Sequence, residues 1–137
     1  EISRIADRWP NSFTRSMSLY THAVQARLVG DITKAEGLIL QSNASAFSIL
    51  TLIEAAEIFE VAAKLDLADE HWAKLEARLG TVFKLWFPGY AIYAWHGRLQ
   101  LAARRRDSQQ FNRCSKLIMT SWGNANPQAI VAKHTYQ

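Results

Sequence analysis

Apolar residues recur along this chain at intervals of three and four, the spacing that places side chains on one face of an α-helix. Such series run through residues 12–29, 32–42, 45–64 and 89–104. Two further series are present, one from Trp72 to Trp86 and one after Asp107. No segment shows the two-residue alternation of a strand. The pattern predicts an all-α protein of about six helices.

The first helix carries a regular apolar stripe that we expect to face the core. Its members follow steps of four, three, four and four: Phe13, Met17, Tyr20, Val24 and Leu28. The third helix has an apolar face opposite three carboxylates, Glu54, Glu57 and Glu60. Glu54 and Glu57 have the spacing of paired acid-base groups, but an exposed acidic stripe is the ordinary interpretation of such a pattern.

Helix-breaking residues divide the six helices into three pairs. Gly30 can adopt the left-handed conformation that closes a helix, and Asp31 can cap the next one. We expect tight turns near Gly30, Leu67 and Arg106, which are 37 and 39 residues apart, and looser corners near Asn43 and Pro88. A period in the high thirties is typical of helical-hairpin repeats.

The first turn resembles a known family. The segment Leu-Val-Gly-Asp-Ile-Thr-Lys-Ala-Glu-Gly-Leu-Ile, residues 28–39, resembles the inner turn and second helix of a tetratricopeptide repeat, and Ala35 would match the small residue where the two helices touch. Residues 103–111 resemble the same turn, although Phe111 stands where the family has a small residue. The resemblance implies a TPR-like α-solenoid of three antiparallel hairpins. A compact helical bundle is the alternative.

Size and composition fit one helical domain over residues 1–137, with less regular ends at 1–10 and 124–137. No apolar run approaches the roughly 18 residues of a membrane span. Cys114 is the only cysteine, so an internal disulfide is impossible. Cytoplasmic proteins usually lack disulfides, so we expect a cytoplasmic protein. Because the chain begins with Glu1, a periplasmic protein or an excised part of a longer one stays open.

Charge is unevenly divided between the two halves. Residues 1–69 contain six Lys/Arg and nine Asp/Glu, a net charge of −3, whereas residues 70–137 contain ten and three, a net charge of +7. Such asymmetry can steer an acidic partner or set two copies head to tail, or it can be an unevenly decorated solvated surface.

Motifs of enzyme chemistry are missing from the sequence. It contains no Gly-x-Ser-x-Gly elbow, no phosphate-binding glycine loop and no His-Glu-x-x-His. The four histidines, His22, His71, His96 and His134, do not pair at metal-binding spacing, and Cys114 lies on an apolar stripe where a buried inert thiol is expected. We therefore expect no catalysis and no cofactor.

Two features favour binding of another protein. The stretch Phe-Lys-Leu-Trp-Phe-Pro-Gly-Tyr-Ala-Ile-Tyr-Ala-Trp, residues 83–95, holds six aromatic residues. We expect Trp86, Tyr93 and Trp95 mainly in the core, and one or two of Phe87, Tyr90 and Tyr93 to stay reachable. Arginines, which match carboxylates and phosphates in two-point geometry, follow it. The candidate site residues are Arg98, Arg104, Arg105, Arg106, Arg113, Lys116, Phe87, Tyr90 and Tyr93.

The resulting hypothesis is a protein-protein interaction module that binds an acidic or amphipathic segment in a helical groove. Repeat scaffolds of the resembled family serve as adaptors, chaperones and assembly subunits. An alternative is binding of nucleic-acid backbones by the same arginines, with Tyr90 or Trp95 as stacking platforms. Self-association is compatible with both.

Overall fold

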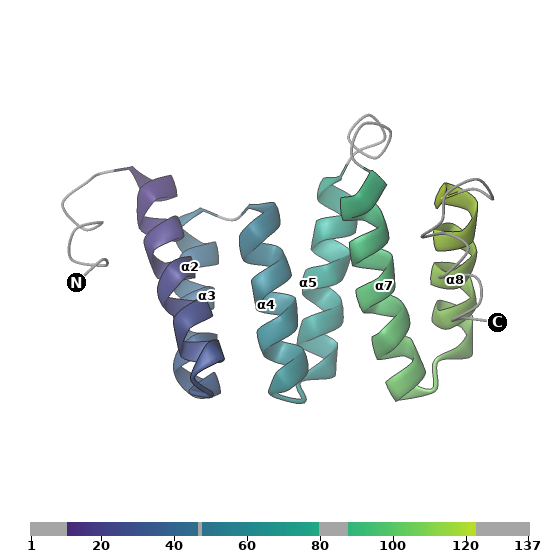
Figure 1. Ribbon diagram of the computed structural model, residues 1–137, viewed down its shortest axis with the longest axis horizontal. Helices are drawn as coiled ribbons and strands as arrows, with labels where there is room; N and C mark the ends of the chain where they lie inside the picture. The colour runs from purple at the N-terminus through teal and green to yellow at the C-terminus, as the bar shows by residue number, and fades with distance from the viewer. Residues whose placement is uncertain (1–10, 47, 80–87, 123–137) are drawn as a thin grey trace. The chain divides into compact units, whose positions relative to one another are not determined.

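The computed structural model describes residues 11–46, 48–79 and 88–122, and all regular elements within them are α-helices (Figure 1). This confirms the all-α prediction. The helices are α2 Ser12–Leu28, α3 Ile32–Ser45, α4 Ile49–Val61, α5 Leu65–Arg78, α7 Pro88–Arg105 and α8 Ser108–Trp122.

The chain divides into two compact units, Glu1–His71 and Trp72–Gln137, with the boundary inside α5. In the first unit α2 packs antiparallel on α3, α3 packs on α4, and α2 also contacts α4 (Figure 1). In the second unit α7 and α8 form an antiparallel pair. The solenoid arrangement stays a prediction.

Three turns between helices share one backbone design. Each contains a left-handed residue, with φ of 86° at Gly30, 61° at Ala63 and 56° at Arg106. The amide after each such residue donates to a carbonyl five residues earlier, which is the hydrogen bond of the Schellman motif. The bonds join Asp31 N to Ala26 O at 2.9 Å, Lys64 N to Phe59 O at 2.8 Å and Asp107 N to Ala102 O at 2.8 Å.

The predicted middle turn at Leu67 is wrong, because α4 ends at Val61 and Leu67 lies inside α5. The left-handed residue there is Ala63, not a glycine, so composition gave no signal for it. The corrected turns are 33 and 43 residues apart. In this register Ala68 lies five residues after its turn residue, as Ala35 does, and both alanines are fully buried.

The apolar stripe predicted to be the inner face of α2 is not its buried face: its two ends are exposed, and Met17, Tyr20 and Val24 are half-buried. Phe13 is 58% exposed and Leu28 is 71% exposed. The buried face is built from smaller residues, chiefly Leu19, Ala23 and Ala26. Helix α2 therefore has two apolar faces. We attribute the choice between them to the small side chains, which let α2 approach its neighbours closely.

The corner between α3 and α4 lies later than predicted, because the helix continues from Ser42 through Ser45. Ser42 is tolerated inside it since its hydroxyl donates to the Ser16 carbonyl at 2.7 Å and lies 3.0 Å from the Ser16 hydroxyl. The new helix begins after Ser48, which forms a reciprocal capping box with Thr51.

The core of the second unit is assembled from α5, α7 and α8. Trp72, Trp95, Leu99, Cys114 and Ile118 are all buried there. The predictions that Trp95 is a core residue and that Cys114 is a buried thiol are thus confirmed. Helix α7 begins at Pro88, a position where the missing amide hydrogen costs no helical hydrogen bond.

Candidate functional site

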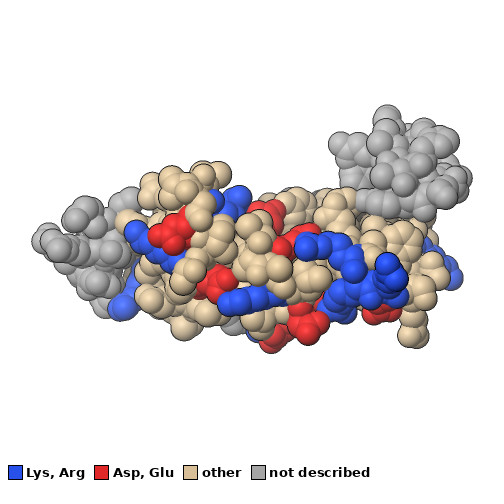
Figure 2. All heavy atoms as spheres, turned by 90° about the horizontal axis from the view of Figure 1, so that it is seen from below, with Lys and Arg blue, Asp and Glu red and all other residues tan. Residues whose placement is uncertain are grey.

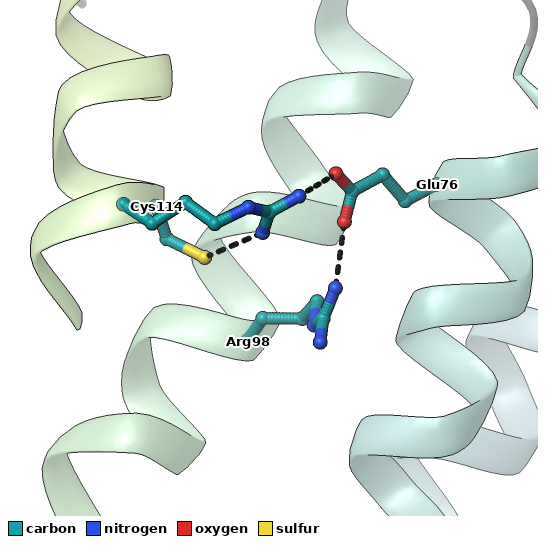
Figure 3. A network of polar contacts seen from close by, with 4 residues as sticks. Glu76, Arg98 and Cys114 are labelled. Atoms are coloured by element: carbon teal, nitrogen blue, oxygen red, sulfur yellow. Dashed lines mark hydrogen bonds and ion pairs between the residues drawn. The ribbon is translucent and has the colours of Figure 1, made fainter. Parts of the chain in front are cut away.

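The carboxylate of Glu76 accepts hydrogen bonds from two of the predicted basic residues of the second unit. Arg98 Nη1 of α7 donates to Glu76 Oε2 of α5 at 2.8 Å, and Arg113 Nη2 of α8 donates to Glu76 Oε1 (Figure 3). In the amide orientation that satisfies both groups, the Gln110 oxygen accepts from Arg98 Nη2 at 2.8 Å and from Nε at 2.9 Å. Glu76 thus pairs with two of the six predicted basic residues, the largely buried Arg98 and the more exposed Arg113.

The electrostatics of this cluster favour the ionised carboxylate. Burial by itself raises the pKa of Glu76, but hydrogen bonds from Arg98 and Arg113 outweigh burial and lower it below its ordinary value. Arg113 Nη1 also contacts Cys114 Sγ at 3.7 Å. Burial nevertheless raises the pKa of the Cys114 thiol, which supports the interpretation of an unreactive residue.

The sequence held one signal for this cluster that was missed. Between Glu70 and Asp107, Glu76 is the only acidic residue in a strongly basic stretch. An isolated carboxylate on a helix otherwise flanked by Lys74 and Arg78 indicates a buried counter-ion. Arg98, whose side chain is only 17% exposed, accordingly contributes to the core rather than to an open surface.

The other predicted basic residues lie on the surface. Arg104, Arg105 and Arg106 are exposed where α7 ends, and Lys116 is exposed on α8. In Figure 2 the molecule is seen from the end at which the turn joins α7 to α8. Lys and Arg side chains gather there over the second unit. Arg105 Nη2 lies 4.0 Å from Asp107 Oδ2, and Asp107 caps α8 through Gln110 N at 3.1 Å.

Two of the predicted aromatic residues are accessible on α7. Tyr90 is 39% exposed and Tyr93 is 47% exposed. The ring of Tyr93 packs obliquely on Trp72, with centroids 5.5 Å apart, so one side of this exposed ring is supported by the core. Phe87, Trp86 and Phe83 lie outside the described residues.

The exposed tyrosines share a helix face with one of the exposed arginines. Tyr90, Tyr93 and Arg104 are separated by three and eleven residues, and both spacings return to the same side of an α-helix. We call these three residues the α7 stripe. It combines two exposed tyrosine rings with a cation at the carboxyl end of the helix.

A second polar cluster connects α2 with α4 in the first unit. Arg27 Nε of α2 donates to Glu54 Oε1 of α4 at 2.6 Å, and Arg27 Nη2 lies 3.9 Å from Glu57 Oε2. The Glu54 side chain is 4% exposed, so the prediction of an exposed acidic stripe is wrong for this residue. Its position is explained by the ion pair, which the sequence pattern of α4 alone does not reveal.

Burial and hydrogen bonding shift the pKa values of three residues in this cluster. Burial raises the pKa of Glu54 despite the hydrogen bond from Arg27. The hydrogen bond to Glu54 raises the pKa of Arg27, which lies nearer the solvent. Burial, and then the nearby charges of Glu54 and Glu57, raise the pKa of Tyr20. Burial therefore disfavours the ionised form of Glu54, and the contacts with Arg27 offset only part of this effect.

Within the described ranges, no group of three or more His, Cys, Asp or Glu residues could hold a metal ion. None of the helices described is both long enough and apolar enough to cross a lipid bilayer. Comparison with protein-family models, with curated proteins and with solved structures gives no match. The surfaces themselves must therefore carry any functional argument.

Proposed function

We propose that this chain is a protein-protein interaction module whose α7 stripe binds an apolar, acidic segment of another protein. The observation that supports this most directly is that Tyr90 and Tyr93 stay exposed on the same helix face as Arg104. Large aromatic rings are usually buried, and accessible tyrosines beside an arginine have the composition of interface hot spots.

The chemistry of the α7 stripe defines the partner. A tyrosine ring offers a large contact area with few rotatable bonds, so ordering it on binding costs little entropy. Arg104, with Arg105 and Arg106 beside it, attracts carboxylates and can bind them through two parallel hydrogen bonds. The expected partner is thus an amphipathic segment with apolar side chains on one side and Asp or Glu near its end.

The proposal omits two residues that the sequence nominated. Arg98 and Arg113 already donate to Glu76, and moving them toward a partner would leave a largely buried carboxylate without its hydrogen bonds. Lys116 lies on α8 and is not needed for the contact. The binding surface is narrower than the basic run alone predicts.

A peptide library displayed on phage and selected against the immobilised protein tests this function. We expect enrichment of peptides that combine Asp or Glu with aromatic or aliphatic residues. Their affinity should fall at least about tenfold in a Y90S/R104E variant and decline with added salt. The L40K variant, which alters an exposed leucine of α3, serves as a control and should bind normally. Peptides that bind Y90S/R104E and the wild type equally would exclude the α7 stripe.

The nucleic-acid alternative relies on the same exposed arginines and predicts a different result. A gel-shift assay with random single-stranded and double-stranded probes at low salt should show no complex if the stripe binds protein segments. The engagement of Arg98 and Arg113 by Glu76 reduces the cations available for phosphates, which is why we favour a protein partner.

A further inference from the structure

The first helices of the three hairpins carry matching residues at equal distances from their turns. Met17, Leu50 and Tyr93 each lie thirteen residues before the left-handed turn residue, whereas Leu28, Val61 and Arg104 each lie two residues before it. The two positions are eleven residues apart, which is close to three full helical turns. Each helix therefore presents both positions on one face.

In the first unit these positions lie on α2 and α4, two helices that contact each other. Arg27 joins the two helices through Glu54. Leu28, Leu50 and Val61 are between 45% and 71% exposed, and Met17 is partly exposed. We call these four residues the α2–α4 face. On α4, Leu50 and Val61 lie on the same side of the helix as Glu57, so the face combines exposed aliphatic side chains with a carboxylate.

The charges beside the α2–α4 face are predominantly negative. Two carboxylates, Glu54 and Glu57, lie near the guanidinium of Arg27 at this surface. The wider half of the chain, residues 1–69, has nine acidic and six basic residues, a net charge of −3. A partner that suits this face has apolar anchors and a nearby cation.

The α7 stripe has this composition. Tyr90 and Tyr93 supply apolar anchors, and Arg104 supplies the cation, in a half of the chain whose net charge is +7 from ten basic and three acidic residues. The carboxylate of Glu57, whose side chain is 33% exposed, is accessible to such a cation. The chain thus presents two surfaces of complementary chemistry.

We propose that the α7 stripe of one copy of this chain docks on the α2–α4 face of a second copy. This inference rests on the proposed function, since it takes the α7 stripe as an interaction surface and identifies its partner. The contact joins two different surfaces and is therefore heterologous. One such contact leaves one α7 stripe and one α2–α4 face unused, so further copies can add head to tail or close a ring.

Sedimentation velocity over a range of protein concentrations tests the proposal. The wild type should form larger species as concentration rises, and these should dissociate when salt screens the charges. Two variants each remove one surface. L28K/V61K places cations on the α2–α4 face at exposed positions, and Y90S/R104E removes an anchor and reverses the charge of the α7 stripe.

A mixture of the two variants gives the decisive result. Alone, each variant has one intact surface with no complementary surface to bind, so each should sediment as a monomer. Mixed, L28K/V61K supplies an intact α7 stripe and Y90S/R104E supplies an intact α2–α4 face. The mixture should therefore form a one-to-one dimer that cannot grow further. A symmetric contact through either surface would not produce this pattern.

Control variants separate loss of contact from loss of fold. L40K on α3 and K116E on α8 alter exposed residues outside both surfaces and should associate like the wild type. Circular dichroism should show equal helix content in all variants.

Two outcomes would overturn the inference. One is a wild type that stays monomeric up to about 0.5 mM at low salt, and the other is a variant mixture that stays monomeric. If the wild type is monomeric but binds selected peptides through the α7 stripe, the proposed function stands and only self-association fails. If peptide selection also fails, both proposals fail.

Discussion

The indole of Trp72 lies directly against Gly97, so a side chain at position 97 has no room. A Cβ atom on Gly97 would lie 2.6 Å from Trp72 Nε1 and 2.7 Å from Cδ2, well inside van der Waals contact. Trp72 is almost fully buried and also packs on Tyr93 of the α7 stripe. The absence of a side chain at residue 97 thereby sets the approach of α5 to α7 and the position of an exposed anchor.

We therefore expect Gly97→Ala to destabilise the second unit by about 2 kcal/mol, the usual cost of overpacking a core, even though alanine favours helices. Urea unfolding followed by tryptophan fluorescence measures this, because four of the five tryptophans lie in residues 72–137. The displaced Trp72 should also shift Tyr93 and weaken binding through the α7 stripe.

Gly37→Ala in α3 is the matched control. A Cβ at Gly37 meets no atom within 4 Å, so only the gain in helix propensity remains. Stability should rise by up to about 1 kcal/mol. Equal effects of the two substitutions would contradict the packing explanation.

Glu76→Gln should destabilise the second unit by about 2–3 kcal/mol at neutral pH. The substitution keeps the shape of the side chain but leaves the largely buried Arg98 without its counter-ion. Arg113→Gln should cost less than about 1 kcal/mol, because the Arg113 side chain is 43% exposed. Urea unfolding of the two variants gives the comparison, and similar losses in both would argue against a central role for Glu76.

Acid should remove the contribution of Glu76. Its pKa is lowered in the folded chain, so its stabilisation is complete above the ordinary value of 4.5 and is lost as pH falls through the folded pKa. The stability difference between wild type and Glu76→Gln should be constant from pH 7 to about pH 5 and shrink below that. A difference that grows with acid would contradict this sign.

Glu54→Gln should cost less at pH 7 than Glu76→Gln, although Glu54 is the more buried of the two carboxylates. The pKa of Glu54 is raised, mainly by burial, so its ionised form is penalised in the folded chain. This penalty is present above the folded pKa and is relieved as pH falls toward 4.5. The wild type should therefore gain stability relative to Glu54→Gln between pH 7 and pH 4.5, which urea unfolding across this range measures.

Helix content and most helix ends could be predicted from the sequence because both depend on local chemistry. Gly30 indicates a turn because glycine adopts the left-handed conformation freely, and Asp107 indicates one because aspartate can cap a helix. Ala63 does not, since an alanine in the left-handed conformation is set by the hydrogen bond from Lys64 N to Phe59 O and by packing rather than by its own preference. The turn was consequently misplaced by four residues, at Leu67 instead of Ala63.

The site was predictable only in part, because helical periodicity does not say which of two apolar faces turns inward. On α2 the spacing predicts that the larger residues, Phe13 and Leu28 among them, are core, but the buried face is the one with smaller residues. For Arg98 and Glu54, ion pairs with residues more than twenty positions away decide burial. Such pairings depend on tertiary packing, which no single-helix pattern contains.

The same local reasoning predicts that Ala63→Gly stabilises the protein. A residue with a Cβ atom pays about 1–2 kcal/mol for the left-handed conformation, whereas glycine adopts it freely but loses some entropy on folding. We expect a net gain of about 0.5–1 kcal/mol in urea unfolding. Gly30→Ala should have the opposite effect, a loss of about 1 kcal/mol, because a Cβ at Gly30 meets nothing within 4 Å and only the backbone strain at φ of 86° remains. If both substitutions changed stability in the same direction, the shared design of the two turns would not be the controlling factor.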